Sequence, residues 1–322
     1  MPSKHPIFDV SRLKLQPLAR REHLMSLADV LPLGQAAGPF EHPALPVLAD
    51  RILAAKQRGS AVVLMLGAHV VKEGLSRYVI DLMRRKLVDV VAVNGAVSIH
   101  DFELSLIGAT SEPVARYIRT GEFGMWRETA AICDVIADGH RQGLGYGEAL
   151  GRHILEKHPH KDVSILAAGY ELGVPVTVHV GIGYDIIHQL PNFDGCSFGG
   201  CSARDFLIYT KAIENLEGGA MLCFGSAVMG PEVYLKALSM ARNVARQQRR
   251  QIAHFTTAVF DLIQLPDDLT QTPGKDQPAY YYRPLKTILI RTISDGGESF
   301  YIQGGHRHTL PALHKQIVSK MK

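Results

Sequence analysis

Small and polar residues follow directly after five short apolar runs, and at these positions the chain could bind a ligand or do chemistry. The five groups are Gly67-Ala68-His69, Asn94-Gly95, residues 179–183, Gly225-Ser226 and Thr257-Ala258. Imidazole, amide and hydroxyl groups can hold the polar atoms of a ligand, and glycine lets a backbone or ligand approach closely. The pattern predicts one binding site assembled from segments far apart in sequence.

The segment that begins at Asn94 places titratable side chains just after a glycine turn. His100, Asp101 and Glu103 stand there at the expected start of a helix. In one interpretation, a phosphate or ribose sits on the turn and a carboxylate orients a cationic substrate or a cofactor hydroxyl. In the alternative, the carboxylates cap the helix and complement its dipole.

The segment that begins at His179 combines two glycines with an acidic residue. Gly181 and Gly183 form a Gly-x-Gly pair that lacks the third glycine of the dinucleotide fingerprint, and Tyr184 and Asp185 follow. Together with glycines at the ends of other expected strands, the pair indicates nucleotide binding. Asp185 is placed to hold a polar group of the ligand.

Trp126 and Lys286 each allow a structural and a functional interpretation. The single tryptophan, Trp126, belongs to the core or walls a ligand pocket beside a glycine turn. Lys286 opens the apolar run 287–290 and either reaches water or, near a dehydrated pocket, acts as a nucleophile that forms imines.

A parallel sheet would bring these residues together. Strands are expected at residues 61–66, 89–93, 175–178, 220–224, 254–256 and 287–290. Helical segments are expected at 46–58 and 70–86 and through most of 101–172, with Ser111 as an N-cap. Helical crossovers between strands favour a parallel sheet, whose strands all end at one edge. The predicted fold class is therefore α/β, a Rossmann-like parallel sheet with helices on both faces.

The chain is expected to hold an N-terminal arm, residues 1–45, and one α/β domain, residues 46–322. Two prolines and irregular patterning mark the arm, which packs either on a neighbouring subunit or on the domain surface. Residues 266–284 hold several prolines and are expected to form a mobile loop, the kind of loop that is often functional.

Composition limits the possible functions. The 322 residues are 46% hydrophobic, and 35 basic against 31 acidic residues give a net charge of +4 without a basic stripe. We therefore expect no nucleic-acid partner. The chain has no apolar run near membrane-spanning length and no signal peptide, so a cytoplasmic protein without a membrane partner is expected. Four cysteines are expected to be free thiols, with no metal site, and six histidines in polar stretches are expected to be exposed: His153, His158, His160, His306, His308 and His314.

From about Ser60 to Leu313 the chain resembles the deoxyhypusine synthase family. The resemblance is clearest in GAHVVKEGLSRYVIDLMRRKLVDVVAVNGAVSIHDFEL, TSEPVARYIRTGEFGMWRE and GIGYDIIHQLPNFDG. It implies an NAD-binding fold and a homotetramer with sites at its dimer interfaces. It also implies a reaction in which spermidine is oxidised with NAD and its aminobutyl group is held on a lysine as an imine before transfer to an acceptor amine.

The resemblance also implies roles for particular residues. The cofactor, NAD, would contact Ala68, His69, Asn94, Gly95, Gly225, Ser226, Thr257 and Ala258, and the strand-end pattern adds Gly67. Lys286 would form the imine and Asp185 would hold a substrate amine, so the catalytic candidates are Lys286, Asp185, His179 and His100. The candidates for substrate binding are Asp101, Glu103, Trp126 and Tyr184.

The expected function is that of an NAD-dependent aminoalkyl transferase acting on a polyamine or a similar small amine. Pro284-Leu285 replaces the Trp-Gly that precedes the family's lysine, so the substrate is expected to be divergent. Two alternatives stay open. One is an NAD-dependent amino-acid deaminase or cyclodeaminase, and the other is a catalytically silent ligand-binding protein of the same fold.

Overall fold

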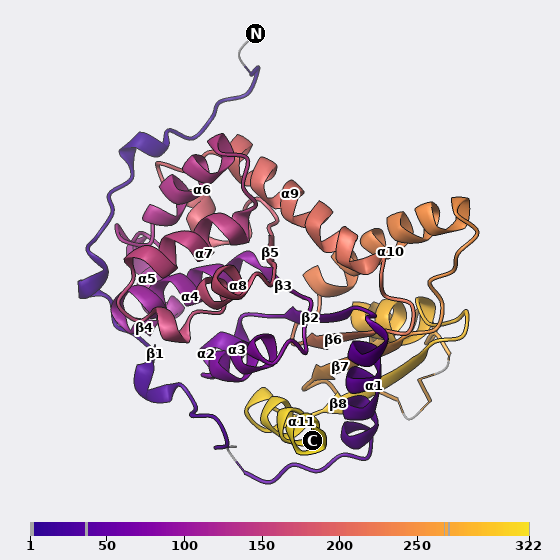
Figure 1. Cartoon of the computed structure of the whole chain (residues 1–322). Coiled ribbons are helices and arrows are strands. Elements are labelled where there is room, and N and C mark those ends of the chain that lie inside the picture. The colour runs from indigo at the N-terminus through magenta and orange to yellow at the C-terminus, as the bar shows by residue number, and fades with distance from the viewer. Residues whose placement is uncertain (1–2, 36–37, 267, 270, 322) are drawn as a thin grey trace.

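A six-stranded parallel sheet lies at the centre of the computed structural model, which describes residues 3–35, 38–266, 268–269 and 271–321. The strand order is β5-β3-β2-β6-β7-β8 (Figure 1). Numbered along the chain within this sheet, that order is 3-2-1-4-5-6, the order of the dinucleotide-binding Rossmann fold. The predicted fold class is confirmed. The strands are β2 (Val62–Leu66), β3 (Val90–Asn94), β5 (Val176–His179), β6 (Ala220–Phe224), β7 (Thr256–Asp261) and β8 (Glu298–Gln303).

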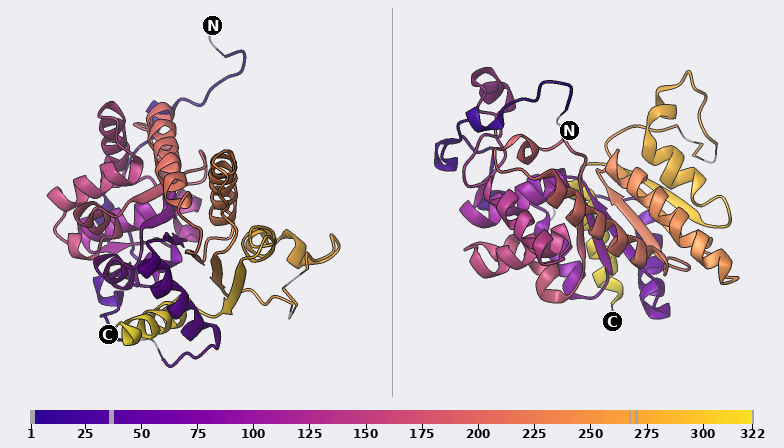
Figure 2. Two further views of the ribbon diagram at one scale, coloured as in Figure 1. Left: turned by 45° about the vertical axis from the view of Figure 1, so that its right-hand side comes forward. Right: turned by 90° about the horizontal axis from the view of Figure 1, so that it is seen from above.

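Helices cover both faces of the sheet and form a separate group beyond its β5 edge (Figures 1 and 2). A short antiparallel pair, β1 (Met25–Ser26) with β4 (Ala109–Thr110), lies outside the main sheet. The α-helices are α1 (Ala44–Arg58), α2 (His69–Lys72), α3 (Ser76–Arg84), α4 (Gly95–Ile107), α5 (Val114–Thr120), α6 (Ala131–Arg141), α7 (Tyr146–Lys157), α8 (Ile165–Leu172), α9 (Gly195–Ile213), α10 (Met229–Gln247) and α11 (His306–Lys320). The remaining helical turns are Val10–Arg12, Leu18–Arg20, Leu27–Asp29, Lys161–Val163, Ile186–Gln189, Pro278–Tyr281 and the π-helix Leu285–Arg291.

Alternating residues of each strand feed two hydrophobic cores. In β2, Leu64 faces the core shared with α1, α3 and α11, whereas Met65 faces the core shared with α9 and α10. Strands buried on both faces need apolar residues at every position, which is why β2 is a continuous apolar run. The two cores pack against both faces of the sheet, and the loops at its carboxyl edge extend from well-packed strands.

Two of the strand predictions were wrong. The seventh strand begins at Thr256, at the end of the predicted run 254–256, and continues to Asp261. The run 287–290 belongs to the π-helix Leu285–Arg291, and the last strand is Glu298–Gln303. A short apolar run fits a buried strand and a buried helix equally well, and here Leu285, Ile288 and Leu289 pack into the core from a helix.

The predicted helix at 70–86 is divided at Gly74. Gly74 has a φ of +75°, and a β-carbon there would overlap with the backbone of Asp29. The chain must therefore turn between α2 and α3. Ser111 is not an N-cap as expected: it has a φ of +64°, and α5 begins at Val114 after Pro113.

The N-terminal segment runs along the outer side of the helices beyond the β5 edge (Figure 1). Gln16 bridges to Trp126, the backbone N–H of Leu18 donates to Glu128, and β1 pairs with β4. This segment packs on its own chain, and the division at residue 45 stays a prediction. In the predicted loop 266–284, residues 267 and 270 lie outside the described residues. None of the helices in the described ranges is long and apolar enough to cross a membrane.

The ends of β2 and β6 touch through two glycines. The N–H of Gly67 donates to the carbonyl of Phe224 at 2.8 Å, and a β-carbon on Gly67 would overlap with the carbonyl oxygen of Gly225. The glycine at this position is therefore required by packing between neighbouring strand ends.

We predict that Gly67→Ala lowers the free energy of unfolding by about 1–3 kcal/mol, the usual effect of overpacking a rigid interior. Chemical denaturation would measure the change. Gly199→Ala is the matched control, because a β-carbon there meets nothing within 4 Å inside α9 and is expected to stabilise the protein slightly. Equal stabilities for the two variants would contradict the packing role of Gly67.

Candidate functional site

Strand register places four of the predicted groups side by side at the carboxyl edge of the sheet. Leu66 pairs with both Val93 and Phe224, and Asn94 pairs with His179. Gly67, Asn94, His179 and Gly225 therefore occupy equivalent positions. Thr257 and Ala258 do not occupy such positions. They lie within β7, where they pair with Met221 and Leu222 of β6, so their predicted place at the edge was wrong. Asp261 ends that strand instead.

The topological switch point lies between β2 and β6. From β2 the chain proceeds to β3 on one side, and from β6 it proceeds to β7 on the other, so the strand order reverses direction between these two central strands. Gly225 has a φ of +61°, and the imidazole of His306 lies where a side chain at Gly225 would point. In this structure the glycines of the switch point accommodate neighbouring protein groups.

His306 is the residue at the switch point that the sequence reasoning missed. It was expected to be exposed, but it begins α11 directly after β8 and is 5% exposed. Burial lowers the pKa of its ring, and Nδ1 has no hydrogen-bond partner within the described chain. Gly304-Gly305, just before it, was an available signal for a tight strand-to-helix turn. His158 and His314 are also buried rather than exposed as expected.

A cavity of about 470 Å³ opens beside α4, and we call it the α4 cavity. It lies next to the carboxyl end of β3, because α4 follows β3 directly. Three of the predicted site residues line it together, His100, Glu103 and Asp185, with Tyr184 exposed at its rim. The other polar residues that line it were not predicted: Arg21, Lys72, Ser111 and Glu112.

Asp185 sits over the first residue of α4. A β-carbon on Gly95 would overlap with the carboxylate of Asp185, so the glycine is needed for this close approach. Burial raises the pKa of Asp185 to about 6. The carboxylate forms no ion pair with any described residue, and its location in the α4 cavity makes it available to a cationic ligand.

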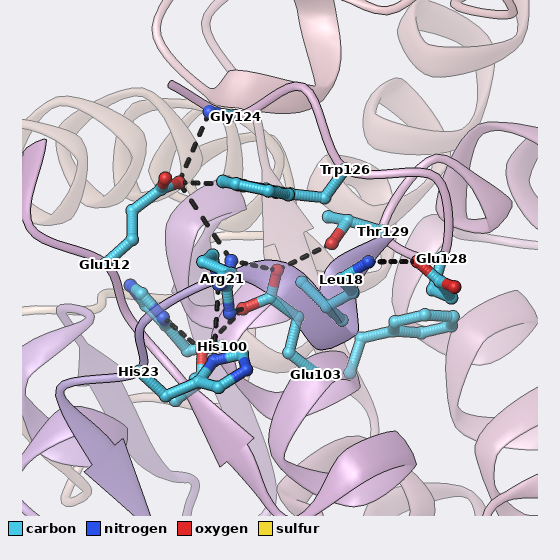
Figure 3. Close-up of polar contacts among 12 residues, drawn as sticks. Leu18, Arg21, His23, His100, Glu103, Glu112, Gly124, Trp126, Glu128 and Thr129 are labelled. Carbon is cyan, nitrogen blue, oxygen red and sulfur yellow. Dashed lines mark hydrogen bonds and ion pairs between the residues drawn. The ribbon is translucent and has the colours of Figure 1, made fainter. Parts of the chain in front are cut away.

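Glu103 is fully occupied by protein partners (Figure 3). Arg21 donates to both of its oxygens, at 2.8 and 2.6 Å, and the hydroxyls of Thr110 and Thr129 donate at 2.7 and 2.6 Å. Burial favours the neutral acid, but the hydrogen bonds and charge of Arg21 outweigh it and lower the pKa of Glu103. Glu103 is thus an ionised structural anchor in the wall of the cavity.

Glu112 differs from Glu103 because one of its oxygens has no partner. Oε1 accepts from the Trp126 indole at 3.0 Å and from the Gly124 backbone at 3.3 Å, whereas Oε2 is buried and has no hydrogen-bond partner in the described part of the chain (Figure 3). The residue is 7% exposed, and burial raises the pKa of its carboxyl group. An unsatisfied buried acceptor in a cavity wall indicates a ligand with a hydrogen-bond donor.

Asp101 and Trp126, two of the predicted substrate-binding residues, make structural contacts. Asp101 accepts from Ser164 and from the N–H of Ile165 at 2.7 Å, so it caps the start of α8. The sequence left open a capping role at the carboxylates' own helix, but Asp101 caps a different helix, and α4 itself is capped by Asn94. Trp126 packs edge-on against Tyr117 and faces the guanidinium of Arg21.

His179 and Lys286 lie outside the α4 cavity. His179 is buried against Tyr209, faces a different cavity of about 310 Å³, and has a pKa lowered to about 3 by burial. Lys286 is 5% exposed in the π-helix, with its Nζ 3.5 Å from the centre of the Tyr280 ring. The lysine that lines the α4 cavity is Lys72, on α2.

The residues of the α4 cavity that were not predicted differ in how far the sequence pointed to them. Glu112 stands in the Thr-Ser-Glu-Pro segment that marked a helix start, and Lys72 comes five residues after Gly67. Arg21 carried no sequence signal, because its partner Glu103 is 82 residues away and the N-terminal segment shows no periodic pattern.

No known protein family matches this sequence, and no curated protein matches it. Solved structures do match its fold. ArgZ, an arginine dihydrolase of the ornithine-ammonia cycle in cyanobacteria, superposes with a TM-score of 0.51 and 12% identity over 88% of this chain and 32% of ArgZ. A protein of Methanococcus maripaludis S2 classed as LOR/SDH gives a TM-score of 0.51 and 12% identity over 90% of this chain and 74% of that protein.

Unliganded AgrE has a TM-score of 0.50 and 14% identity over 86% of this chain and 32% of AgrE. The chain therefore spans about a third of the length of ArgZ and of AgrE. A structure from Entamoeba histolytica that bears the name deoxyhypusine synthase is more distant, with a TM-score of 0.43 and 10% identity over 82% of this chain and 77% of that protein. At these identities the likeness shows a shared fold.

Asp185→Asn should make the protein more stable at neutral pH. The pKa of Asp185 is about 6 in the fold and 3.8 in its ordinary state, so the folded protein binds more protons and loses stability as pH rises between these values. We expect the variant to exceed the wild type by about 2–3 kcal/mol at pH 7 and by almost nothing below about pH 4. Urea denaturation across this range would measure the difference. A pH-independent difference would contradict the desolvation of this charge.

Proposed function

We propose that this chain is an NAD-dependent enzyme that oxidises the amine-bearing carbon of a small amine or amino acid. The observation that carries the proposal is the pair of acidic side chains in the α4 cavity. Asp185 forms no ion pair with the described residues, and Glu112, whose Oε1 lies 3.9 Å from Nη1 of Arg21, keeps a buried Oε2 without a hydrogen-bond partner among them. The two carboxylates stand next to the carboxyl edge of a sheet with the strand order of dinucleotide-binding folds.

The strand order and the polar residues at the switch point support a dinucleotide as the ligand there. His306 has a buried ring nitrogen without a partner, which a ligand hydroxyl or phosphate would satisfy. His69, Asn94 and Ser226 follow strands at the same edge and would hold the cofactor's polar groups. AgrE, which shares this fold, has been crystallised with ornithine and NAD+. When bound, NAD would accept a hydride from the carbon next to the substrate's amine.

The α4 cavity supplies the protonation state that such an oxidation needs. An amine can lose a hydride from its neighbouring carbon only when its nitrogen lone pair is free, so an ammonium group must first give up a proton. Asp185, whose raised pKa is about 6, is a better proton acceptor than an ordinary aspartate. The partly dehydrated cavity also favours the neutral amine.

The charges of the cavity favour an amino acid over a simple polyamine. Lys72 lines the cavity and makes no ion pair or hydrogen bond with the described residues. A zwitterionic ligand could place its carboxylate at Lys72 and its ammonium groups at Asp185 and Glu112. A polyamine would leave Lys72 as a repelling charge.

Aminoalkyl transfer is a second candidate, and Lys286 is the observation that favours it. A buried lysine with an aromatic contact and no carboxylate partner among the described residues is unusual, and π-helices often occur at functional sites. Lys286 does not line the α4 cavity of its own chain. The transfer would therefore need an arrangement in which a subunit of a homotetramer brings its lysine to the cavity of another.

We expect NADH to form when the protein is mixed with NAD and ornithine, and less readily with putrescine. Asp185→Asn should lower kcat/KM by at least about 100-fold, the usual effect of losing a positioned proton acceptor, while NAD still binds. NADH absorbance and calorimetric titration would measure the two quantities.

Asp295→Asn is the control, because this exposed carboxylate lies far along the chain from the α4 cavity and does not line it. Binding of NAD without any NADH formation from amines or amino acids would favour a silent binding protein. No binding of NAD would overturn the proposal.

Borohydride reduction during turnover distinguishes aminoalkyl transfer through a lysine imine from oxidation without a covalent intermediate. If Lys286 forms an imine, mass spectrometry will find the aminoalkyl adduct on the peptide that holds Lys286, and Lys286→Arg will abolish it. An adduct on Lys72 instead would place the nucleophile in the α4 cavity. Turnover without any adduct would rule out transfer through a lysine imine.

A further inference from the structure

Three side chains in contact, two of them buried and the third, His100, partly buried, form a line that ends in the α4 cavity. Glu103 Oε2 accepts from Thr110 Oγ1 at 2.7 Å, and Thr110 Oγ1 lies 2.9 Å from Nδ1 of His100. Thr110 is 0% exposed and Glu103 is 1% exposed, so water does not compete for these contacts. The direction of each hydrogen bond therefore depends on the protein groups alone.

Glu103 can only accept. Arg21 donates to both of its oxygens and neutralises its charge, and Thr129 donates to Oε1. A carboxylate held in this way stays ionised and has no proton to give. The single hydroxyl proton of Thr110 must therefore point at Glu103, because the opposite orientation would place two oxygen lone pairs 2.7 Å apart.

Only one hydrogen-bond direction then remains possible between Thr110 and His100. With its proton committed to Glu103, Thr110 can only accept from His100, so Nδ1 must carry the hydrogen. We infer that Glu103 and Thr110 are positioning residues that lock His100 as the Nδ1–H tautomer and leave Nε2 as a bare acceptor in the α4 cavity. This is the arrangement by which a third group orients a catalytic imidazole.

The role of this tautomer in binding a substrate rests on the proposed function. His100 lines the α4 cavity, and its Nε2 makes no hydrogen bond with the described residues. Nε2 is therefore a third acceptor beside Asp185 and Glu112, and the three together suit a ligand with several N–H donors.

The charge state of the ring is set by all the groups that face it. The pKa of His100 is lowered to about 4. Burial is the main cause, Glu103 opposes it, and Lys72 and His69 on α2 and Arg21 on the N-terminal segment add to the lowering. The ring is thus neutral at physiological pH. A neutral ring with so low a pKa does not take a proton from an ammonium group. Its role is to orient a substrate N–H while Asp185 takes the proton.

The tautomer can be measured directly by NMR on protein labelled with ¹⁵N-histidine. Two-bond proton–nitrogen spectra of the ligand-free wild type should show His100 with a protonated Nδ1 and an unprotonated Nε2, and His100→Gln identifies its signals by their loss. Thr110→Val, similar in shape, removes the acceptor, so the proton should move to Nε2. Thr110→Ser keeps the hydroxyl and should restore the Nδ1–H form.

A wild-type ring protonated at Nε2, or a tautomer unchanged in Thr110→Val, would overturn the inference. The wild-type spectrum alone shows which nitrogen of His100 is protonated, even if a variant fails to fold. Because the measurement needs neither cofactor nor substrate, its failure is separate from a failure of the proposed function. If NADH forms from ornithine, Thr110→Val should raise the KM for ornithine by about tenfold with a smaller change in kcat, and Thr110→Ser should not.

Discussion

Arg21 and Glu103 form an ion pair in which each side chain is 1% exposed, and four separate parts of the chain meet at it. Arg21 comes from the N-terminal segment, Glu103 from α4, and the two threonines that complete the shell from β4 and the segment before α6. Burying two charges is costly unless every lone pair is satisfied, and here the bidentate contact and two hydroxyls satisfy them. The ionised state of Glu103 in turn fixes the hydrogen-bond directions at Thr110, and one wall of the α4 cavity takes its shape from the N-terminal segment.

The sheet places this wall beside the switch point, because all of its strands are parallel and end at the same edge. At that edge the glycines have a more specific role than the sequence indicated. Gly67 accommodates Gly225, and Gly95 accommodates Asp185. Glycine at a strand end therefore predicts close approach without telling whether a ligand or the protein itself makes the approach. The identity of the approaching group follows from the tertiary structure.

The central part of the fold could be predicted from local pattern, and the parts that failed share a physical cause. β2, β3, β5 and β6 are apolar runs that end in glycine or polar residues, and the sequence located them correctly. The π-helix at Leu285 and the strand at Glu298 were missed because burial, rather than intrinsic preference, decides their form. The sequence placed His100, Glu103 and Asp185 among its candidates because each follows a strand end, and the structure brings all three to the α4 cavity. Arg21 carried no local signal, because its partner Glu103 is 82 residues away. The local signals near Glu112 and His306, a helix start and a Gly-Gly turn, do not reveal their tertiary contacts.

Three aspartates with raised pKa values show why geometry identifies the candidate site and a perturbed pKa does not. Burial raises the pKa of Asp101 to about 6, of Asp185 to about 6 and of Asp205 to about 7. Asp101 accepts from the start of α8, and Asp205 accepts from Val178 at 2.7 Å and Gly147 at 2.9 Å, so both tie structural elements together. Burial also raises the pKa of Asp185, but this residue caps only the short helical turn Ile186–Gln189, and it faces a cavity. Such a desolvation cost persists in a fold when a ligand offsets it, which is the physical reason to place substrate recognition at Asp185.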